Sequence, residues 1–148
     1  MSGMRAGPVL KALAARTVAT WVATLPEPAT SERVRDDFFY VRVPGHARRW
    51  IPIEIEVDER TVRLTSHVLI PPEEDAESFW RFLLRTNADA SDAAFAIDPD
   101  GVVLLVGRTP CDGLTEDDLD RIVGAIVTKT ERTFRTLLRI GFASRFSD

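Results

Sequence analysis

The first apolar pattern in the chain has the spacing of a helix. Pro8 suits a first helical turn, where its missing N–H costs nothing. The positions that share one helical face after it are Leu10, Leu13, Ala14, Thr17 and Trp21. Pro26 and Pro28 end this pattern, and residues 29–32 predict a short polar connection.

The hydrophobic spacing then changes to the alternation that is typical of β-strands. The alternating positions are Phe39, Val41 and Val43, then Ile51, Ile53, Ile55 and Val57, and then Val62, Leu64, Ser66 and Val68. Pro44-Gly45 and residues 58–60 supply turns between these segments. We therefore expect an antiparallel meander with one apolar face and one polar face.

A helix and a hairpin are predicted after the meander. Residues 73–77 are rich in carboxylates, which are favourable at the positive end of a helix dipole. Asn87 is expected to end this helix in a left-handed conformation. Residues 98–101, Asp-Pro-Asp-Gly, predict a type I turn followed by a left-handed glycine, which joins two strands.

The last pattern predicts one long helix. Thr115 is the expected N-cap, with Asp118 three residues later as in a capping box, and helical apolar spacing continues to Leu138. Glu131 and Arg135 are expected to form an ion pair on its solvated side.

The order α-β-β-β-α-β-β-α predicts an α+β fold. We expect a two-layer α/β sandwich, in which three helices cover one face of a mainly antiparallel sheet. The chain length suits one domain over residues 1–148, with residues 1–7 as a flexible N-terminus.

Composition limits the classes of function. Hydrophobic residues make up 45% and charged residues 28% of the chain, which is ordinary for a globular domain. The net charge of -4 argues against a nucleic-acid partner, because phosphate binding relies on a surplus of Lys and Arg. No segment has the roughly 20 apolar residues that span a bilayer, and no signal peptide is recognisable. The single cysteine forms no intramolecular disulfide, so we expect a reducing, cytoplasmic location.

No reaction centre is recognisable among the residues that carry chemistry. His46 is placed in a turn and His67 on the polar face of a strand, and neither has the spacing of a metal or catalytic motif. Cys111 is interpreted as an ordinary loop thiol, with a reactive thiol near a helix start as the alternative. We therefore expect no enzymatic activity, no metal and no cofactor.

Aromatic residues on the polar face of the meander are the strongest indication of a partner. Phe38, Tyr40 and Trp50 fall on the strand face opposite to the alternating apolar positions. A second chain covering this face would explain them, and packing under the first helix is the alternative. Arg48 and Arg49 have the chemistry to bind an acidic peptide or RNA beside Trp50.

Three segments of the chain resemble the bacterial YbjN family. They are residues 82–88 (Phe-Leu-Leu-Arg-Thr-Asn-Ala), residues 95–101 (Phe-Ala-Ile-Asp-Pro-Asp-Gly), and residues 114–120 (Leu-Thr-Glu-Asp-Asp-Leu-Asp) running on to 137–142 (Leu-Leu-Arg-Ile-Gly-Phe). The resemblance implies a type III secretion chaperone-like fold and a small intracellular sensory-transduction regulator, similar in structure to chaperones that dimerise and hold a polypeptide. It implies no agreed activity. This chain departs from the commoner pattern at residues 48–50 and at Pro52.

The sequence thus predicts a non-enzymatic, chaperone-like or regulatory adaptor that binds a polypeptide partner as a homodimer. Binding is expected through the open sheet face or through a free strand edge. The expected contact residues are Phe38, Tyr40, Arg48, Arg49 and Trp50. No membrane or nucleic-acid partner is expected. The alternative function is a small-molecule or nucleotide-binding sensory regulator, with a pocket between the helices and the sheet.

Overall fold

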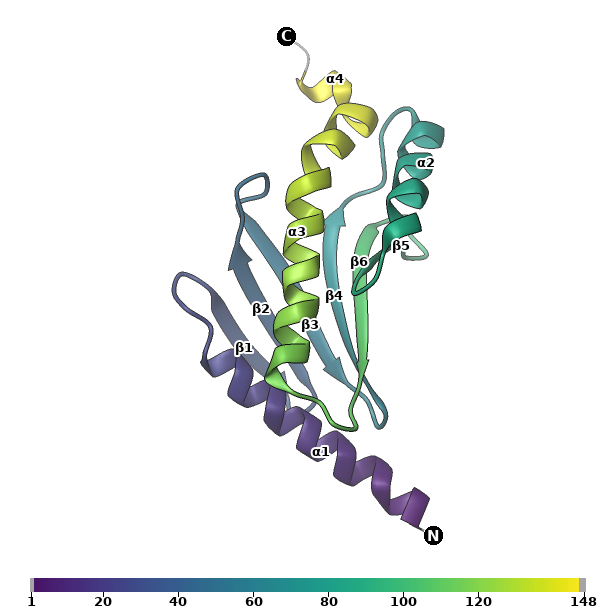
Figure 1. Cartoon of the computed structure of the whole chain (residues 1–148). Coiled ribbons are helices and arrows are strands. Elements are labelled where there is room, and N and C mark those ends of the chain that lie inside the picture. The colour runs from purple at the N-terminus through teal and green to yellow at the C-terminus, as the bar shows by residue number, and fades with distance from the viewer. Residues whose placement is uncertain (1, 147–148) are drawn as a thin grey trace.

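The computed structural model describes residues 2–146, with side chains from Gly7 onward, and combines helices with one sheet (Figure 1). In chain order the elements are α1 (Ser2–Ala23), β1 (Thr30–Arg35), β2 (Phe38–Pro44), β3 (Trp50–Val57), β4 (Thr61–Leu69), α2 (Ala76–Thr86), the 3₁₀ helix η1 (Asn87–Asp89), β5 (Ala94–Ile97), β6 (Val103–Pro110), α3 (Glu116–Gly141) and α4 (Ala143–Phe146). The predicted α+β class is confirmed.

The six strands form one antiparallel sheet in the order β1-β2-β3-β4-β6-β5. β1 to β4 follow one another as a meander. After β4 the chain leaves the sheet, forms α2 and returns as β5. β6 then lies between β4 and β5 in the sheet. β1 and β5 are therefore the two edge strands.

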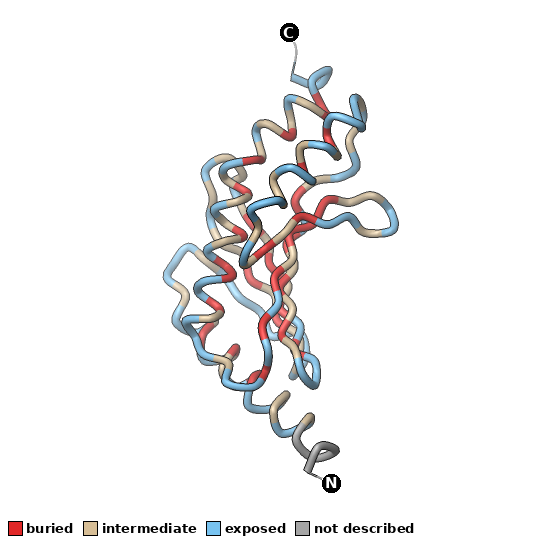
Figure 2. Tube along the Cα trace, turned by 45° about the vertical axis from the view of Figure 1, so that its right-hand side comes forward, coloured by how far each residue is buried: buried red, intermediate tan, exposed pale blue. Residues whose placement is uncertain are grey.

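The long helices cover one face of this sheet (Figure 1). α3 runs along the sheet, α1 crosses the end where α3 begins, and α2 lies beside β5. Buried residues gather between the helices and the sheet (Figure 2). Ile53, Ile55 and Leu64, which alternate along β3 and β4, are fully buried. Because burial of one such side chain contributes about 1.5–3 kcal/mol, this layer fixes the strand register.

The polar connection predicted after the first helix is wrong, because residues 30–35 form strand β1. This strand pairs with β2 from Thr30 opposite Arg42 to Arg35 opposite Phe38. All six of its residues are exposed, so it has no apolar alternation that a sequence pattern would detect. The order is therefore α-β-β-β-β-α-β-β-α followed by the short α4, with four strands before α2 in place of three.

The first helix begins earlier than predicted. α1 starts at Ser2, so Pro8 lies inside it rather than in its first turn. Proline at this position removes one intrahelical hydrogen bond but leaves the rest of the helix intact. Met1 lies outside the described residues, and the flexibility of residues 1–7 stays a prediction.

The end of α2 differs from the predicted left-handed cap. Asn87 has a right-handed φ of -67° and continues into η1. Its side-chain amide instead exchanges two hydrogen bonds with the main chain of Phe95, in which Nδ2 donates to the carbonyl oxygen (2.9 Å) and Oδ1 accepts from the N–H (2.7 Å). The amide thus acts as a short piece of strand beside β5.

The carboxylates predicted at the start of α2 divide into two groups: Glu77 lies in the first turn of the helix as predicted, whereas Glu73 and Glu74 contact the far end of the chain. α2 begins at Ala76, beyond Glu73 and Glu74. Glu73 pairs with Arg145, and Glu74 accepts hydrogen bonds from the N–H (2.6 Å) and hydroxyl (2.9 Å) of Ser144. Both contacts hold α4 against the β4–α2 connection.

The predicted turn and the predicted cap of α3 are confirmed. Gly101 has a φ of +84°, which a residue with a side chain rarely adopts. The Thr115 hydroxyl accepts from the Asp118 N–H (3.2 Å), and the Asp118 carboxylate accepts from the Thr115 N–H (3.0 Å). This reciprocal pair satisfies two N–H groups that a helix start leaves free.

Candidate partner-binding surface

The sheet face that points away from the helices carries aromatic side chains on β2 and β3. Phe38, Tyr40 and Trp50 are each half-buried. Their chain neighbours Phe39 and Ile51 are buried in the core. Because side chains alternate across a strand, the three aromatic residues lie on the opposite, open face. α1 packs on the face of the sheet that α3 covers, so α1 does not cover these aromatic residues.

The aromatic residues are spread along the paired strands β2 and β3. Phe38 lies opposite Glu56, Tyr40 opposite Glu54, and the last pair joins Pro44 to Trp50. At about 3.3 Å per strand residue, this ladder is roughly 20 Å long. The surface therefore matches the length of a short extended segment of polypeptide.

Two arginines stack on these rings. The Arg42 guanidinium lies 4.7 Å from the centroid of the Trp50 ring, and that of Arg35 lies 5.1 Å from the Phe38 ring. Stacking uses the flat face of a guanidinium and leaves the N–H donors at its edge available. The open face thus offers apolar rings and hydrogen-bond donors side by side.

The two arginines of the β2–β3 loop have different surroundings. Arg48 donates to the main-chain oxygen of His67 (2.6 Å) and lies 6.0 Å from the Phe134 ring of α3. The pairing between β3 and β4 ends at Thr65, so β3 gives no hydrogen-bond donor to the main-chain oxygen of His67. The Arg48 side chain supplies that donor instead. Burial lowers the pKa of Arg48. Arg49 is exposed.

The predicted contact residues are therefore not all together. The structure brings Phe38, Tyr40 and Trp50 onto one face, and Arg49 lies exposed next to Trp50 in the chain. Arg48 is engaged within the chain by its hydrogen bond to β4. A contact between these five residues and a partner stays a prediction.

Glu131 on α3 holds the β2–β3 loop in place. Its carboxylate accepts from the main-chain N–H groups of His46 (2.9 Å) and Ala47 (2.8 Å). Burial acts to raise the pKa of Glu131, but the hydrogen bonds from the loop amides outweigh it, and the pKa lies below its ordinary value. The predicted ion pair with Arg135 is wrong, because the loop amides occupy the carboxylate. No residue pattern predicted this role, because every residue except proline has a main-chain amide.

The two edges of the sheet differ in how open they are. At β5, Asn87 satisfies the main-chain N–H and carbonyl of Phe95. β1 has six exposed residues, of which five pair with β2, and no strand among the described residues pairs with its other side. A bulge between Arg33 and Arg35 interrupts the register there. Charges and bulges on an edge strand weaken its pairing with other chains. A partner strand would therefore need charges complementary to those of β1.

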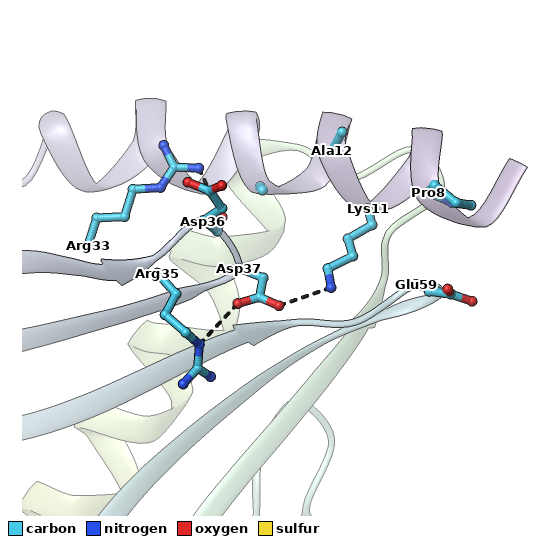
Figure 3. A pocket seen from close by; sticks show the side chains of 9 residues that line it. Pro8, Lys11, Ala12, Arg33, Arg35, Asp36, Asp37 and Glu59 are labelled. Carbon is cyan, nitrogen blue, oxygen red and sulfur yellow. Dashed lines mark hydrogen bonds and ion pairs between the residues drawn. The ribbon is translucent and has the colours of Figure 1, made fainter. Parts of the chain in front are cut away.

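A charged cleft lies between α1 and the turn from β1 to β2 (Figure 3). Its volume is about 690 Å³, and its lining combines apolar residues of α1 with charged side chains such as Arg33 and Glu59. Lys11 of α1 forms an ion pair with Asp37 (2.9 Å), and Arg35 approaches the other carboxylate oxygen (3.4 Å). The hydrogen bond between Lys11 and Asp37 raises the pKa of Lys11 and lowers the pKa of Asp37. These pairs tie α1 to the sheet and neutralise much of the charge in the cleft.

The residues considered above for catalysis or metal binding are His46, His67 and Cys111. His46 and His67 are exposed, as predicted, on a loop and on β4. Cys111 is buried, with Sγ 3.2 Å from the Asp58 carbonyl oxygen, and burial raises the pKa of its thiol. Within residues 2–146 no group of three or more His, Cys, Asp or Glu side chains is placed to hold a metal ion. None of the described helices is long and apolar enough to cross a membrane.

A family model covers most of this architecture. The YbjN family, described as "Putative bacterial sensory transduction regulator", matches residues 16–139. The chain belongs to the YbjN family. The match runs from the middle of α1 to the last turns of α3, so it includes the whole sheet of this YbjN-family chain.

Curated relatives come from mycobacteria. Uncharacterised proteins of Mycobacterium tuberculosis and Mycobacterium bovis are each 33% identical over 104 residues, which make up 70% of this chain. The chain spans 57% of the length of those relatives.

The fold is similar to that of type III secretion chaperone complexes. A chain of the heterodimeric ExoU–SpcU complex from Pseudomonas aeruginosa is 18% identical with a TM-score of 0.57, over 78% of this chain and 93% of that one. A chain of the Yersinia pestis chaperone SycH in complex with a stable fragment of YscM2 is 13% identical with a TM-score of 0.53, over 79% and 96%. The predicted type III secretion chaperone-like fold is confirmed.

Proposed function

We propose that this YbjN-family chain is a non-enzymatic, chaperone-like or regulatory adaptor of the cytoplasm that binds a polypeptide partner. The observation that carries the proposal is the open face of the sheet, on which Phe38, Tyr40 and Trp50 are half-buried and none of the described helices lies over them. Aromatic residues of this kind are enriched where proteins meet. The proposal is further supported by two solved complexes of similar fold, each of which pairs polypeptides.

The geometry favours a partner segment in extended conformation. The aromatic side chains follow the β2–β3 ladder, and the cation–π stacks place donors beside them for carbonyl or carboxylate groups. The β1 edge continues the same sheet, so a segment that adds a strand there reaches the open face directly. In this proposal the rings supply affinity and the charges of β1 restrict the choice of partner.

The proposed adaptor acts as a homodimer. Two copies present twice the open surface to one polypeptide, which raises the effective concentration of the second site. Size-exclusion chromatography with light scattering measures this directly. A mass of one chain at every tested concentration would reject the homodimer while leaving polypeptide binding in place.

The test of the function replaces two rings on the open face. Tyr40→Ser combined with Trp50→Ser removes apolar contact area from half-buried positions, so folding should be retained. The wild-type chain, isolated from its own host under mild conditions, is expected to retain a polypeptide that mass spectrometry identifies. The double variant is expected to lose it.

Phe146→Ser is the matched control, because Phe146 is an aromatic residue that is 65% exposed on α4, away from the open face. This control should retain the polypeptide. Equal recovery of the polypeptide from all three proteins, with unchanged thermal unfolding, would contradict the proposed surface. Absence of any retained polypeptide from the wild type would contradict the function.

A small-molecule or nucleotide sensor is the second candidate, favoured by the cleft of about 690 Å³ beside α1. Lys11 and Arg35 in its lining would bind an anionic ligand in exchange for their present contacts with Asp37. A thermal-shift screen against nucleotides and metabolites discriminates the two functions. The adaptor is expected to show no shift, whereas a shift that Lys11→Ala abolishes would favour the sensor.

A further inference from the structure

A second apolar surface lies at the opposite edge of the sheet from β1. A groove of about 170 Å³ separates α2 from β5 and is lined by apolar side chains and Asn87. Leu84 on α2 and Ile97 on β5 stand at its rim and are 72% and 55% exposed. Trp80 and Leu84 also line a shallow hollow on the outer side of α2. Exposed apolar side chains that converge around a groove mark an interaction site more strongly than isolated ones.

The groove is not built to accept a β-strand. The main chain of Phe95 at the β5 edge already bonds with the Asn87 amide on both its N–H and its carbonyl. β5 has only four residues, which leaves little edge beyond that position. An occupant must therefore bind through side chains, as an amphipathic helix does when it places its apolar stripe in a groove.

The charges in the hollow beside the groove select the kind of helix. Arg81 is paired with Glu77 (2.9 Å), whereas Arg85 has no acidic partner among the described residues. Both arginines lie beside Leu84 on the exposed side of α2. Glu77, Arg81 and Arg85 together leave a positive charge in this hollow, although the chain as a whole has a net charge of -4. A second copy of α2 would bring the same unpaired arginine, whereas a partner helix with acidic residues supplies the opposite charge.

We infer that the α2–β5 groove binds an amphipathic helix of a partner polypeptide, with Leu-like side chains in the groove and acidic residues beside Arg85. The inference rests on the proposed function and adds to it a site apart from the open face. Ala96 lines the groove and lies opposite Leu104 of β6, and β6 and β4 separate this edge from the aromatic residues on β2 and β3.

The test uses two designed peptides of fifteen or so residues that differ only in charge, a length that gives a few helical turns. Both carry leucines at helical spacing; the first has Glu beside them and the second has Lys. Fluorescence polarisation measures their affinity for the full chain at low salt. The Glu peptide is expected to bind about tenfold more tightly than the Lys peptide, and added salt is expected to reduce the difference.

Variants at the rim decide whether binding occurs in the groove. Leu84→Ser and Ile97→Ser should each weaken the Glu peptide about tenfold, and Arg85→Glu should reverse the preference toward the Lys peptide. Leu84 and Ile97 are exposed, so both variants should fold. Leu13→Ser, at a leucine that is 51% exposed on α1, is the matched control and should change nothing.

Each of the following peptide or vesicle results would overturn the inference: no binding of the Glu peptide, binding that Leu84→Ser leaves intact, no reversal by Arg85→Glu, or binding of anionic phosphatidylglycerol vesicles in place of the peptide. A dimer that Leu84→Ser dissociates would overturn it in favour of a second copy. The peptide assay does not involve Tyr40 or Trp50, so its failure is distinguishable from failure of the proposed function. Tyr40→Ser with Trp50→Ser would then still release the retained polypeptide.

Discussion

Ser66 is a polar residue in the apolar layer between the sheet and α3. It lies on the buried face of β4, between Leu64 and Val68, and is fully buried. Its hydroxyl has no hydrogen-bond partner among the described residues. A buried hydroxyl without a partner costs about 1–3 kcal/mol, because it has lost its hydrogen bonds to water. Ser66 is thus a position where the native residue is not the most stable one.

Ser66→Ala is expected to increase the free energy of unfolding by about 1 kcal/mol, since it removes the unpaired hydroxyl and little volume. Urea unfolding measures the change. Thr130→Val is the matched control, because the buried Thr130 hydroxyl donates to the Ile126 carbonyl oxygen (2.8 Å) and its removal should give no gain. A loss of stability in Ser66→Ala would contradict the absence of a partner.

Glu131 makes the stability of the β2–β3 loop depend on pH. Its pKa in the folded chain lies below the ordinary value, so its contribution is present above about pH 4.3 and is lost as the pH falls through the folded pKa. Glu131→Gln is expected to lower the free energy of unfolding at pH 7 by about 1 kcal/mol, a modest figure because the site is partly solvated.

Urea midpoints of Glu131→Gln and of the wild type between pH 7 and pH 3 test this dependence. The two midpoints should converge as the pH falls below the folded pKa, because the wild-type carboxyl is then uncharged as well. A difference that stays constant over this range would show that the charge is not what holds the loop.

Residue roles were predictable from the sequence where both partners are close in the chain. The capping box of Thr115 and Asp118 has such a local signature. Glu131 and Arg48 do not, because each binds main-chain atoms of a segment that is distant in the sequence. The half-buried aromatic residues were found because strand alternation places them on one face regardless of their partners.

At the scale of elements, the sequence predicted the buried strands and missed the exposed one. β3 and β4 alternate between buried and more exposed residues, which is the signal that periodicity detects. β1 is exposed throughout, and only its pairing with β2 makes it a strand. Hydrophobic periodicity therefore did not predict the β1 edge, which is part of the proposed binding surface. It did predict the open face beside that edge.

Asn87 is expected to protect the opposite edge. Asn87→Ala removes both hydrogen bonds to Phe95 and should lower the free energy of unfolding by about 1–2 kcal/mol. The amide hydrogen of Phe95 should then exchange with solvent faster. Asn87→Asp, which keeps the acceptor for the Phe95 N–H but places a carboxylate against its carbonyl, should also destabilise the edge while slowing that exchange relative to Asn87→Ala. Unchanged exchange of Phe95 in both variants would contradict the role of Asn87.

At the scale of the whole molecule, the helices and the sheet bury one core and leave two apolar surfaces. The first is the aromatic open face of β2 and β3, and the second is the groove between α2 and β5. Periodicity predicted the first, because the face of a strand is a property of the sequence. The groove arises only when α2 is placed beside β5, so Leu84 and Ile97 gave no sign of it in the sequence.

Site-specific photocrosslinking in the producing cell tests the central claim most directly. Benzoyl-phenylalanine in place of Tyr40 puts the reactive group on the open face, and the same residue in place of Phe146 puts it on an exposed aromatic position of α4. Light is expected to convert the Tyr40 protein, and not the Phe146 protein, into a heavier adduct containing a second polypeptide. A Tyr40 protein that forms no polypeptide adduct, or forms no more than the Phe146 protein does, would contradict the central claim.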